Sequence, residues 1–231
     1  MNFIFDLYGT LIDIKTDEND RAPWETACAF LGLDKSAWQQ VQLEYSALCR
    51  SRITGPEHEI QLLDVFRDLL HNHGKDEAVA GELAWQFRRA STHKLRLFDG
   101  AREMLTALHK ADAGVYLLSN AQACFTLPEL ELLELLPLFD GVIISSEVGV
   151  KKPQKKIFDI ALDRFSLCAD ECVYVGNDMR DDVLGATRAG LKTAYIHTEQ
   201  SGSYDIEMPS PTYVARDHTH LAQILLDITN Q

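Results

Sequence analysis

The sequence is poor in cysteine, has fewer basic than acidic residues, and has no long apolar run. Its five cysteines are odd in number and scattered, with no Cys-x-x-Cys pair. We therefore expect neither a disulfide framework nor a zinc knuckle, and a reducing cytoplasm fits best. Charge, Gly or Pro interrupts every apolar run within about ten residues, so we expect no membrane span. The N-terminal residues lack the basic region of a signal peptide.

The chain is also short of positive charge. Its 22 Lys and Arg residues stand against 35 Asp and Glu residues, giving a net charge of −13. Duplex nucleic acid is not an expected partner, because its binding needs a basic surface. An anionic substrate would need a local cation, either a side chain or a metal. A hydrophobic fraction of 46% and a charged fraction of 25% are globular composition and exclude a disordered chain.

The order of apolar patterns indicates two parts. Residues 2–6 form a short apolar run that ends in a carboxylate, which predicts a buried strand. Between 15 and 97 we find no convincing strand, and helical spacing predicts a four-helix unit over 22–31, 35–49, 57–70 and 77–90.

From residue 98 onward, helices and apolar strands alternate. The expected strands cover 114–120, 142–146, 172–178, 192–196 and 212–215. The expected helices cover 101–111, 124–135, 153–165, 180–189 and 218–229, and a polar loop covers 199–211. Regular alternation predicts an α/β fold with a parallel sheet covered on both faces.

Polar side chains follow four of the expected strands. Asp6 ends the first, Ser119-Asn120 the second, Ser145-Ser146 the third and Asn177-Asp178 the fourth. Ligands of open parallel sheets bind beyond the carboxyl ends of the strands, so these residues are candidates for one site. Each feature alone is ordinary, since a polar residue after a strand is usually a turn or helix cap.

Their order along the chain resembles that of the haloacid dehalogenase-like hydrolase superfamily, which has four motifs. Asp6-Leu7-Tyr8-Gly9-Thr10-Leu11 is similar to the first motif, Ser119 to the second, Lys152 to the third and Gly176 to Asp182 to the fourth. The resemblance implies a Rossmann-like core with an all-helical cap inserted after the first strand. We accordingly expect the core at 1–14 and 98–231 and the cap at 15–97.

The resemblance also implies roles for single residues. Asp6 would be the nucleophile, which as a carboxylate needs no base. Lys152 would offset its charge, and Thr10, Ser119 and Asn120 would bind the substrate. Mg²⁺ would be held by Asp6, the Tyr8 carbonyl and Asp178, with Asp182 as a ligand or directly behind the ligands. Carboxylates about 5 Å apart repel by roughly 3 kcal/mol at an effective dielectric constant near 20, which a divalent cation relieves.

One residue departs from the phosphatase pattern and leaves the activity open. Phosphatases of the superfamily carry Asp two positions after the nucleophile as general acid and base, whereas this chain has Tyr8, a weak proton donor. Tyr there resembles the 2-haloacid dehalogenase branch, but the acid-rich fourth motif does not, and Gln39 stands where that branch has Arg. We favour a Mg²⁺-dependent phosphatase acting on a small phosphorylated molecule through an aspartyl-phosphate. A metal-independent dehalogenase and a weakly active or ligand-binding relic are the alternatives.

The remaining conspicuous residues have ordinary interpretations. Trp24, Trp38 and Trp85 are expected to pack in the core of the cap. Lys151 is a weaker candidate than Lys152 for the third motif. The basic residues of the cap are expected mostly at the surface, with the alternative that one of them reaches over the pocket to bind substrate: Arg50, Arg52, Arg88, Arg89 and Lys94.

Overall fold

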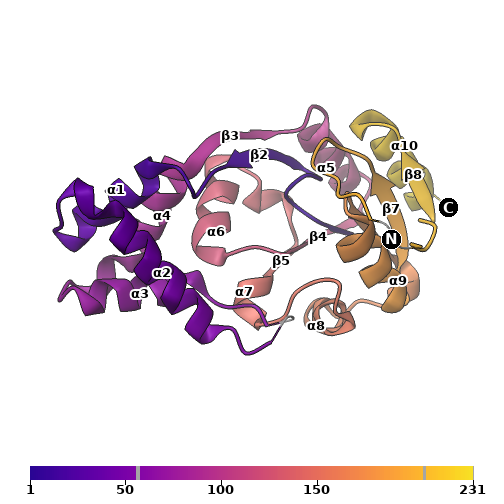
Figure 1. Ribbon diagram of the computed structural model, residues 1–231. Helices are drawn as coiled ribbons and strands as arrows, with labels where there is room; N and C mark the ends of the chain where they lie inside the picture. The colour runs from indigo at the N-terminus through magenta and orange to yellow at the C-terminus, as the bar shows by residue number, and fades with distance from the viewer. Residues whose placement is uncertain (56–57, 205–206, 231) are drawn as a thin grey trace.

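A six-stranded parallel sheet forms the larger part of the molecule, as the sequence predicts (Figure 1). The computed structural model describes residues 1–55, 58–204 and 207–230. The strands are β1 (Asn2–Phe5), β4 (Gly114–Ser119), β5 (Gly141–Ile144), β6 (Cys172–Gly176), β7 (Lys192–Ile196) and β8 (Tyr213–Ala215). Their order is β5-β4-β1-β6-β7-β8, so the first strand of the chain lies in the middle of the sheet.

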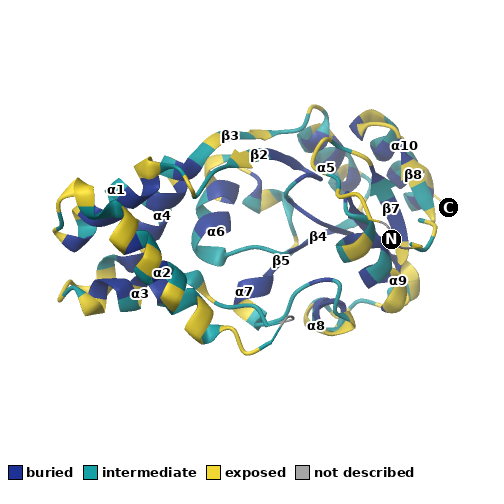
Figure 2. Cartoon of the chain, viewed as in Figure 1, coloured by how far each residue is buried: buried dark blue, intermediate teal, exposed yellow. Residues whose placement is uncertain are grey.

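Apolar side chains alternate between the two faces of this sheet. Phe3 and Phe5 of β1 pack on one side with Leu105 of α5 (Ala101–Lys110) and Leu225 of α10 (His218–Thr229). Ile4 packs on the other side with α8 (Lys155–Phe165) and α9 (Gly185–Arg188). Both faces are buried, which explains why these strands are continuous apolar runs. Figure 2 shows β1 and β4 as mostly buried ribbons inside the molecule, whereas exposed residues lie on the helices and loops around them.

The helices that cover the sheet follow the predicted alternation, except that α7 (Ser145–Val148) is not expected from the sequence: residues 145–146 begin this helix and do not end the strand predicted over 142–146. They are α5 (Ala101–Lys110), α6 (Ala123–Leu132), α7 (Ser145–Val148), α8 (Lys155–Phe165), α9 (Gly185–Arg188) and α10 (His218–Thr229). Before α9, the segment Met179–Leu184 forms a π-helix, in place of the start of the helix expected over 180–189. Residues 205–206 of the predicted polar loop lie outside the described residues.

Four further helices pack together beyond α6: α1 (Arg21–Leu31), α2 (Trp38–Arg52), α3 (Leu62–Asn72) and α4 (Ala80–Ser91). Their shared core is aromatic, and Trp24 is 2% exposed with its ring edge-on to Tyr45 and Phe87. The helix predicted over 57–70 begins at Leu62, and its predicted start at residue 57 lies outside the described residues. Phe125 of α6 joins this cluster, so α6 touches both parts of the molecule.

The expectation that residues 15–97 contain no strand is wrong. β2 (Ile12–Thr16) and β3 (Thr92–Leu97) pair antiparallel, with Asp13 opposite Arg96. This ribbon carries the chain from the sheet to the four helices and back. Its residues are mostly half-exposed, so they form neither an apolar run nor a clean alternation. The division into a core of 1–14 and 98–231 and a cap of 15–97 stays a prediction.

Within the described part of the chain, no helix combines the length and the apolar character that crossing a membrane requires.

Candidate active site

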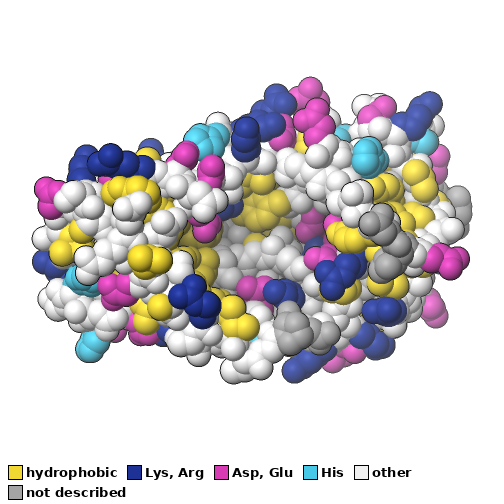
Figure 3. Space-filling view, in the orientation of Figure 1, with side chains coloured by type: hydrophobic (Ala, Val, Ile, Leu, Met, Phe, Trp, Pro, Cys, Tyr) yellow, Lys and Arg dark blue, Asp and Glu magenta, His cyan; other side chains and the backbone are white. Residues whose placement is uncertain are grey.

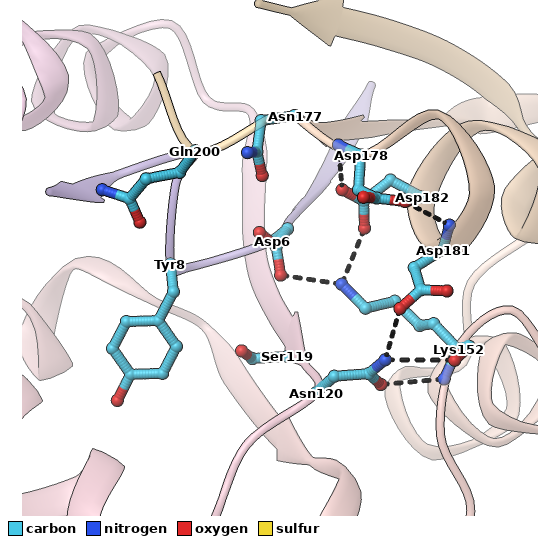
Figure 4. A pocket seen from close by; sticks show the side chains of 10 residues that line it. All are labelled: Asp6, Tyr8, Ser119, Asn120, Lys152, Asn177, Asp178, Asp181, Asp182 and Gln200. Atoms are coloured by element: carbon cyan, nitrogen blue, oxygen red, sulfur yellow. Dashed lines mark hydrogen bonds and ion pairs between the residues drawn. The ribbon is translucent and has the colours of Figure 1, made fainter. Parts of the chain in front are cut away.

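A cavity of about 180 Å³ opens at the carboxyl ends of β1, β4 and β6 (Figure 4). The space-filling view shows that this face of the molecule is hollowed between the helical end and the sheet end (Figure 3). The residues that line the cavity lie at the end of β4, in the loops beyond the strands and in the π-helix: Asp6, Tyr8, Ser119, Asn120, Lys152, Asn177, Asp178, Asp181, Asp182 and Gln200. Most of the residues predicted for the site from distant parts of the chain therefore meet at one edge of the sheet.

Asp6 lies at the centre of this edge because β1 is the middle strand. Its backbone N–H donates to the carbonyl of Val175 at 2.8 Å, which continues the pairing of β1 with β6. One carboxylate oxygen accepts a hydrogen bond from the Thr10 hydroxyl at 3.0 Å, and the other accepts one from Lys152 Nζ at 2.7 Å. Asp6 is buried, and these two hydrogen bonds fix the orientation of its carboxylate.

Lys152 connects two carboxylates inside the protein. Its ammonium group is 2.7 Å from an oxygen of Asp6, 2.7 Å from an oxygen of Asp182 and 2.9 Å from the Tyr174 hydroxyl. Burial opposes the charge of Lys152, but Asp182 and Asp6 raise its pKa well above the ordinary value. Lys152 is thus a fixed cation beside Asp6, and Lys151 does not line the cavity.

Asp182 is buried behind Lys152. Its second carboxylate oxygen accepts the backbone N–H of Asp178 at 2.9 Å. Gly176 makes room for this carboxyl group, because a Cβ there would lie 2.3 Å from its carbon. Burial raises the pKa of Asp182, while Lys152 acts in the opposite direction. Asp182 is 1% exposed and its other oxygen is 2.7 Å from Lys152 Nζ, so this position suits support of Lys152 better than direct metal binding.

Asp178 and Asp181 line the outer side of the cavity. One oxygen of Asp178 caps the π-helix by accepting the N–H groups of Arg180 and Asp181, and the other accepts the Tyr204 hydroxyl. Asp181 accepts one hydrogen bond from Asn120, and its other oxygen is buried with no hydrogen-bond donor within the described ranges. Burial and the neighbouring Asp178 raise the pKa of Asp181.

The predicted substrate-binding residues differ in whether their side chains already form hydrogen bonds within the protein. The Ser119 hydroxyl faces the cavity, and among the described residues it has no hydrogen-bond partner. Asn120 uses its amide to hold the main chain of Lys152, with contacts of 2.8 Å and 3.0 Å. The Thr10 hydroxyl lies between Asp6 and Asn177, at 3.0 Å and 3.1 Å from their oxygens. Ser119 is therefore free for a ligand, whereas Asn120 and Thr10 organise the loops around it.

The geometry agrees with a comparison by sequence. A model of the haloacid dehalogenase-like hydrolase family matches residues 1–190. The chain belongs to this family. The resemblance noted in the four motifs is thereby confirmed, and the protein is a hydrolase of this family.

Relatives of this haloacid dehalogenase-like hydrolase carry phosphatase and nucleotidase names. The glyceraldehyde 3-phosphate phosphatase of Pyrococcus furiosus is 31% identical over 132 residues, which cover 57% of the chain and 55% of that relative. The chain thus spans about half the length of that phosphatase. The 5′-nucleotidase of Pseudomonas aeruginosa is 27% identical over 228 residues, covering 97% of the chain and 95% of that protein.

A solved structure shows the same fold over the whole chain. The 2-haloacid dehalogenase of Pseudomonas syringae aligns with a TM-score of 0.64 and 22% identity, and covers 99% of each chain. At this identity the similarity concerns the architecture alone.

The side chain of Tyr8 in this hydrolase points away from Asp6 (Figure 4). Its hydroxyl is 2.9 Å from the Thr126 hydroxyl and donates to the Glu129 carboxylate. Burial and Glu129 raise the pKa of the Tyr8 phenol well above its ordinary value. This geometry does not favour the predicted proton transfer by Tyr8, although its main chain remains beside Asp6.

Several residues of the site were not among the predicted site residues. Asn177 and Asp181 line the cavity, and their place inside the fourth motif, Gly176 to Asp182, is the sequence signal that identifies them. Glu129 and Arg88 are buried charges, and Arg88 was expected at the surface. The apolar segment 125–133 contains two glutamates, of which Glu131 is exposed, so nothing in the sequence singles out Glu129, Gln200 or the burial of Arg88.

Proposed function

We propose that this hydrolase is a Mg²⁺-dependent phosphatase that acts on a small phosphate monoester through an aspartyl-phosphate. One observation carries the proposal: Asp6, Lys152 and three further carboxylates line a single cavity, with Lys152 as the one cation among the residues lining it. The phosphatase and nucleotidase names of the relatives agree with it. We also propose a cytoplasmic location, which the odd number and scattered positions of the cysteines favour.

The donor set of the cavity fits a magnesium ion. Lys152 neutralises part of the charge of Asp6 and Asp182. The buried oxygen of Asp181 has no hydrogen-bond donor in the described part, and the exposed Arg180 approaches it only to 3.9 Å, so the acidic wall of the cavity is left with excess negative charge. No three acidic, His or Cys side chains of the described residues form a metal cluster by themselves, so neutral oxygens must contribute. Mg²⁺ accepts such mixed sets and keeps several waters.

We assign the protein ligands to Asp6, the carbonyl of Tyr8 and Asp178, with water at the remaining positions. Asn177 and Asp181 would lie beside the ion, and Asp182 behind the ligands. Bound there, the ion would neutralise charge on the phosphoryl oxygens.

The residues of the chain account for the rest of the reaction. A carboxylate oxygen of Asp6 attacks phosphorus as the bond from phosphorus to the leaving oxygen breaks, and water then hydrolyses the aspartyl-phosphate. Lys152 and the Ser119 hydroxyl bind the phosphoryl oxygens, and Thr10 holds Asp6 in its direction. Asp182 keeps Lys152 in place.

A phosphate-release assay tests this function. We expect the protein to release phosphate from p-nitrophenyl phosphate with Mg²⁺, and EDTA to abolish the release reversibly. Asp6→Asn should lower turnover by roughly 10³-fold or more, because the nucleophile is lost while the fold remains. Release that is insensitive to EDTA would exclude the magnesium mechanism.

Tyr8 supports dehalogenation as a second candidate, since Tyr at this position is similar to the dehalogenase branch. The acidic wall of the cavity disfavours it, because a haloacid brings a second carboxylate next to Asp178 and Asp181. Chloride release from 2-chloropropionate in the presence of EDTA would support this alternative. If neither phosphate nor chloride is released but a ligand binds, the result would support the third alternative, a weakly active or ligand-binding relic.

A further inference from the structure

A buried polar cluster joins the four-helix unit to the loop that carries Asp6. We call it the Tyr8 cluster, and it consists of Tyr8, Arg88, Thr126 and Glu129. Arg88 belongs to α4, Thr126 and Glu129 belong to α6, and Tyr8 follows β1 by three residues. Arg88, Thr126 and Glu129 are buried, with Glu129 fully enclosed, and Tyr8 is half-buried.

Glu129 occupies the centre of the cluster. Arg88 Nε donates to one of its oxygens at 2.6 Å, and the Tyr8 hydroxyl donates to the other. Separating these partners would leave a charge buried and unpaired, which is strongly unfavourable. The cluster therefore ties α4, α6 and the loop after β1 into one arrangement.

The same contacts fix the ring of Tyr8. The Arg88 guanidinium lies 5.8 Å from the centre of the Tyr8 ring and 5.2 Å from that of Phe125. The Tyr8 ring lines the cavity while its hydroxyl reaches away from Asp6 into the cluster (Figure 4). A group held in this way shapes the cavity but does not reach the leaving oxygen.

We propose that Arg88 and Glu129 are positioning residues of the phosphatase reaction, and that they hold Tyr8 as a fixed wall of the cavity. The inference rests on the proposed function. The bond from phosphorus to the leaving oxygen breaks with its electron pair on that oxygen, which takes its proton from water and not from the Tyr8 phenol. The preferred substrates are consequently esters of acidic alcohols or phenols.

Two substrates with different leaving groups test this proposal: p-nitrophenyl phosphate and the less acidic benzyl phosphate. We expect Tyr8→Phe to change kcat/KM by a similar factor for the two substrates, so that the two factors differ by no more than about threefold. A proton donor would instead make benzyl phosphate lose ~10²-fold more than p-nitrophenyl phosphate. Such a selective loss would overturn the proposal.

A double-mutant cycle tests the positioning role. Glu129→Gln should lower kcat/KM for both substrates by about tenfold. Adding Tyr8→Phe should lower kcat/KM little further, because both substitutions disturb the same contact between the Tyr8 hydroxyl and Glu129. Glu131→Gln, an exposed neighbour on α6, is the matched control and should retain wild-type values. Additive losses in Tyr8→Phe and Glu129→Gln would contradict the shared role.

Two controls keep the outcomes separate. If Glu129→Gln fails to fold, as judged by far-UV circular dichroism, Tyr8→Phe still decides the question because it leaves the Arg88–Glu129 pair intact. Wild-type release from p-nitrophenyl phosphate establishes the function before any variant is compared. Its absence would refute the proposed function and this inference together, whereas selective loss in Tyr8→Phe would refute this inference alone.

Discussion

Lys152 is the residue on which the charge balance of the cavity depends. It is 3% exposed and lies between the carboxylates of Asp6 and Asp182, which would repel each other without it. A buried ion pair of this kind adds little stability over an apolar pair, but removing one partner leaves the other charge uncompensated. Its stability and catalytic roles can therefore be separated by substitution.

We expect Lys152→Met to lower the free energy of unfolding by about 3 kcal/mol, because Asp182 is left buried and unpaired. Adding Asp182→Asn should recover much of that loss without restoring phosphate release. Urea unfolding and the phosphate assay measure the two effects. Lys151→Met is the control and should leave both close to wild type; equal stability losses in the two single variants would contradict this account.

At the scale of elements, the turn after β1 determines where the first motif points. Gly9 has a φ of +81°, a conformation that L-residues with a Cβ adopt at a cost. A Cβ on Gly9 would also lie 2.5 Å from the Asn177 amide nitrogen. The turn thus brings two motifs, 168 positions apart in the chain, into direct contact.

Gly9→Ala should destabilise the protein by about 2 kcal/mol or more and should reduce phosphate release, because Asn177 has to move. Gly74→Ala is a matched control: Gly74 has a φ of +63°, but a Cβ there meets nothing within 4 Å. We expect that control to lose about 1 kcal/mol and to keep its activity. Urea unfolding shows the difference, and equal effects would rule out the close approach as the cause.

At the scale of the whole molecule, the last helix supports the first loop. His218, at the start of α10, lies 2.7 Å from the carbonyl of Thr10 and stacks on Phe98. Burial lowers the pKa of His218 below its ordinary value of 6.5, although the bond to Thr10 acts in the opposite direction. The folded protein therefore favours neutral His218 more than the unfolded chain does.

This predicts a specific loss of stability in acid. The contribution of His218 is complete above about pH 6.5 and is lost as the pH falls through its lower folded-state pKa, because protonation then favours the unfolded chain. The decrease in unfolding free energy between pH 7 and pH 5 should be smaller in His218→Gln than in wild type. His71→Gln, in which an exposed histidine is replaced, should follow the wild-type profile; identical profiles for all three proteins would be inconsistent with this role.

Local patterns were sufficient for much of this fold. The parallel strands are buried on both faces, so each one is a continuous apolar run that can be recognised alone. Strand β3 could not be recognised in this way, because it is half-exposed and forms only by pairing with β2, some 80 positions earlier. Arg88 lies on a helix with ordinary spacing, and its burial follows from its contacts with Glu129 and with the rings of Tyr8 and Phe125.

The sequence by itself determined the α/β class, the family and the loops in which the candidate site lies, because these follow from local apolar patterns and from the order of short motifs. Tertiary structure alone decided the direction of each side chain: Asp178 caps a helix, Asp182 supports Lys152, and Tyr8 turns away from Asp6. Side-chain direction depends on partners far away in the chain, and no local pattern encodes those contacts.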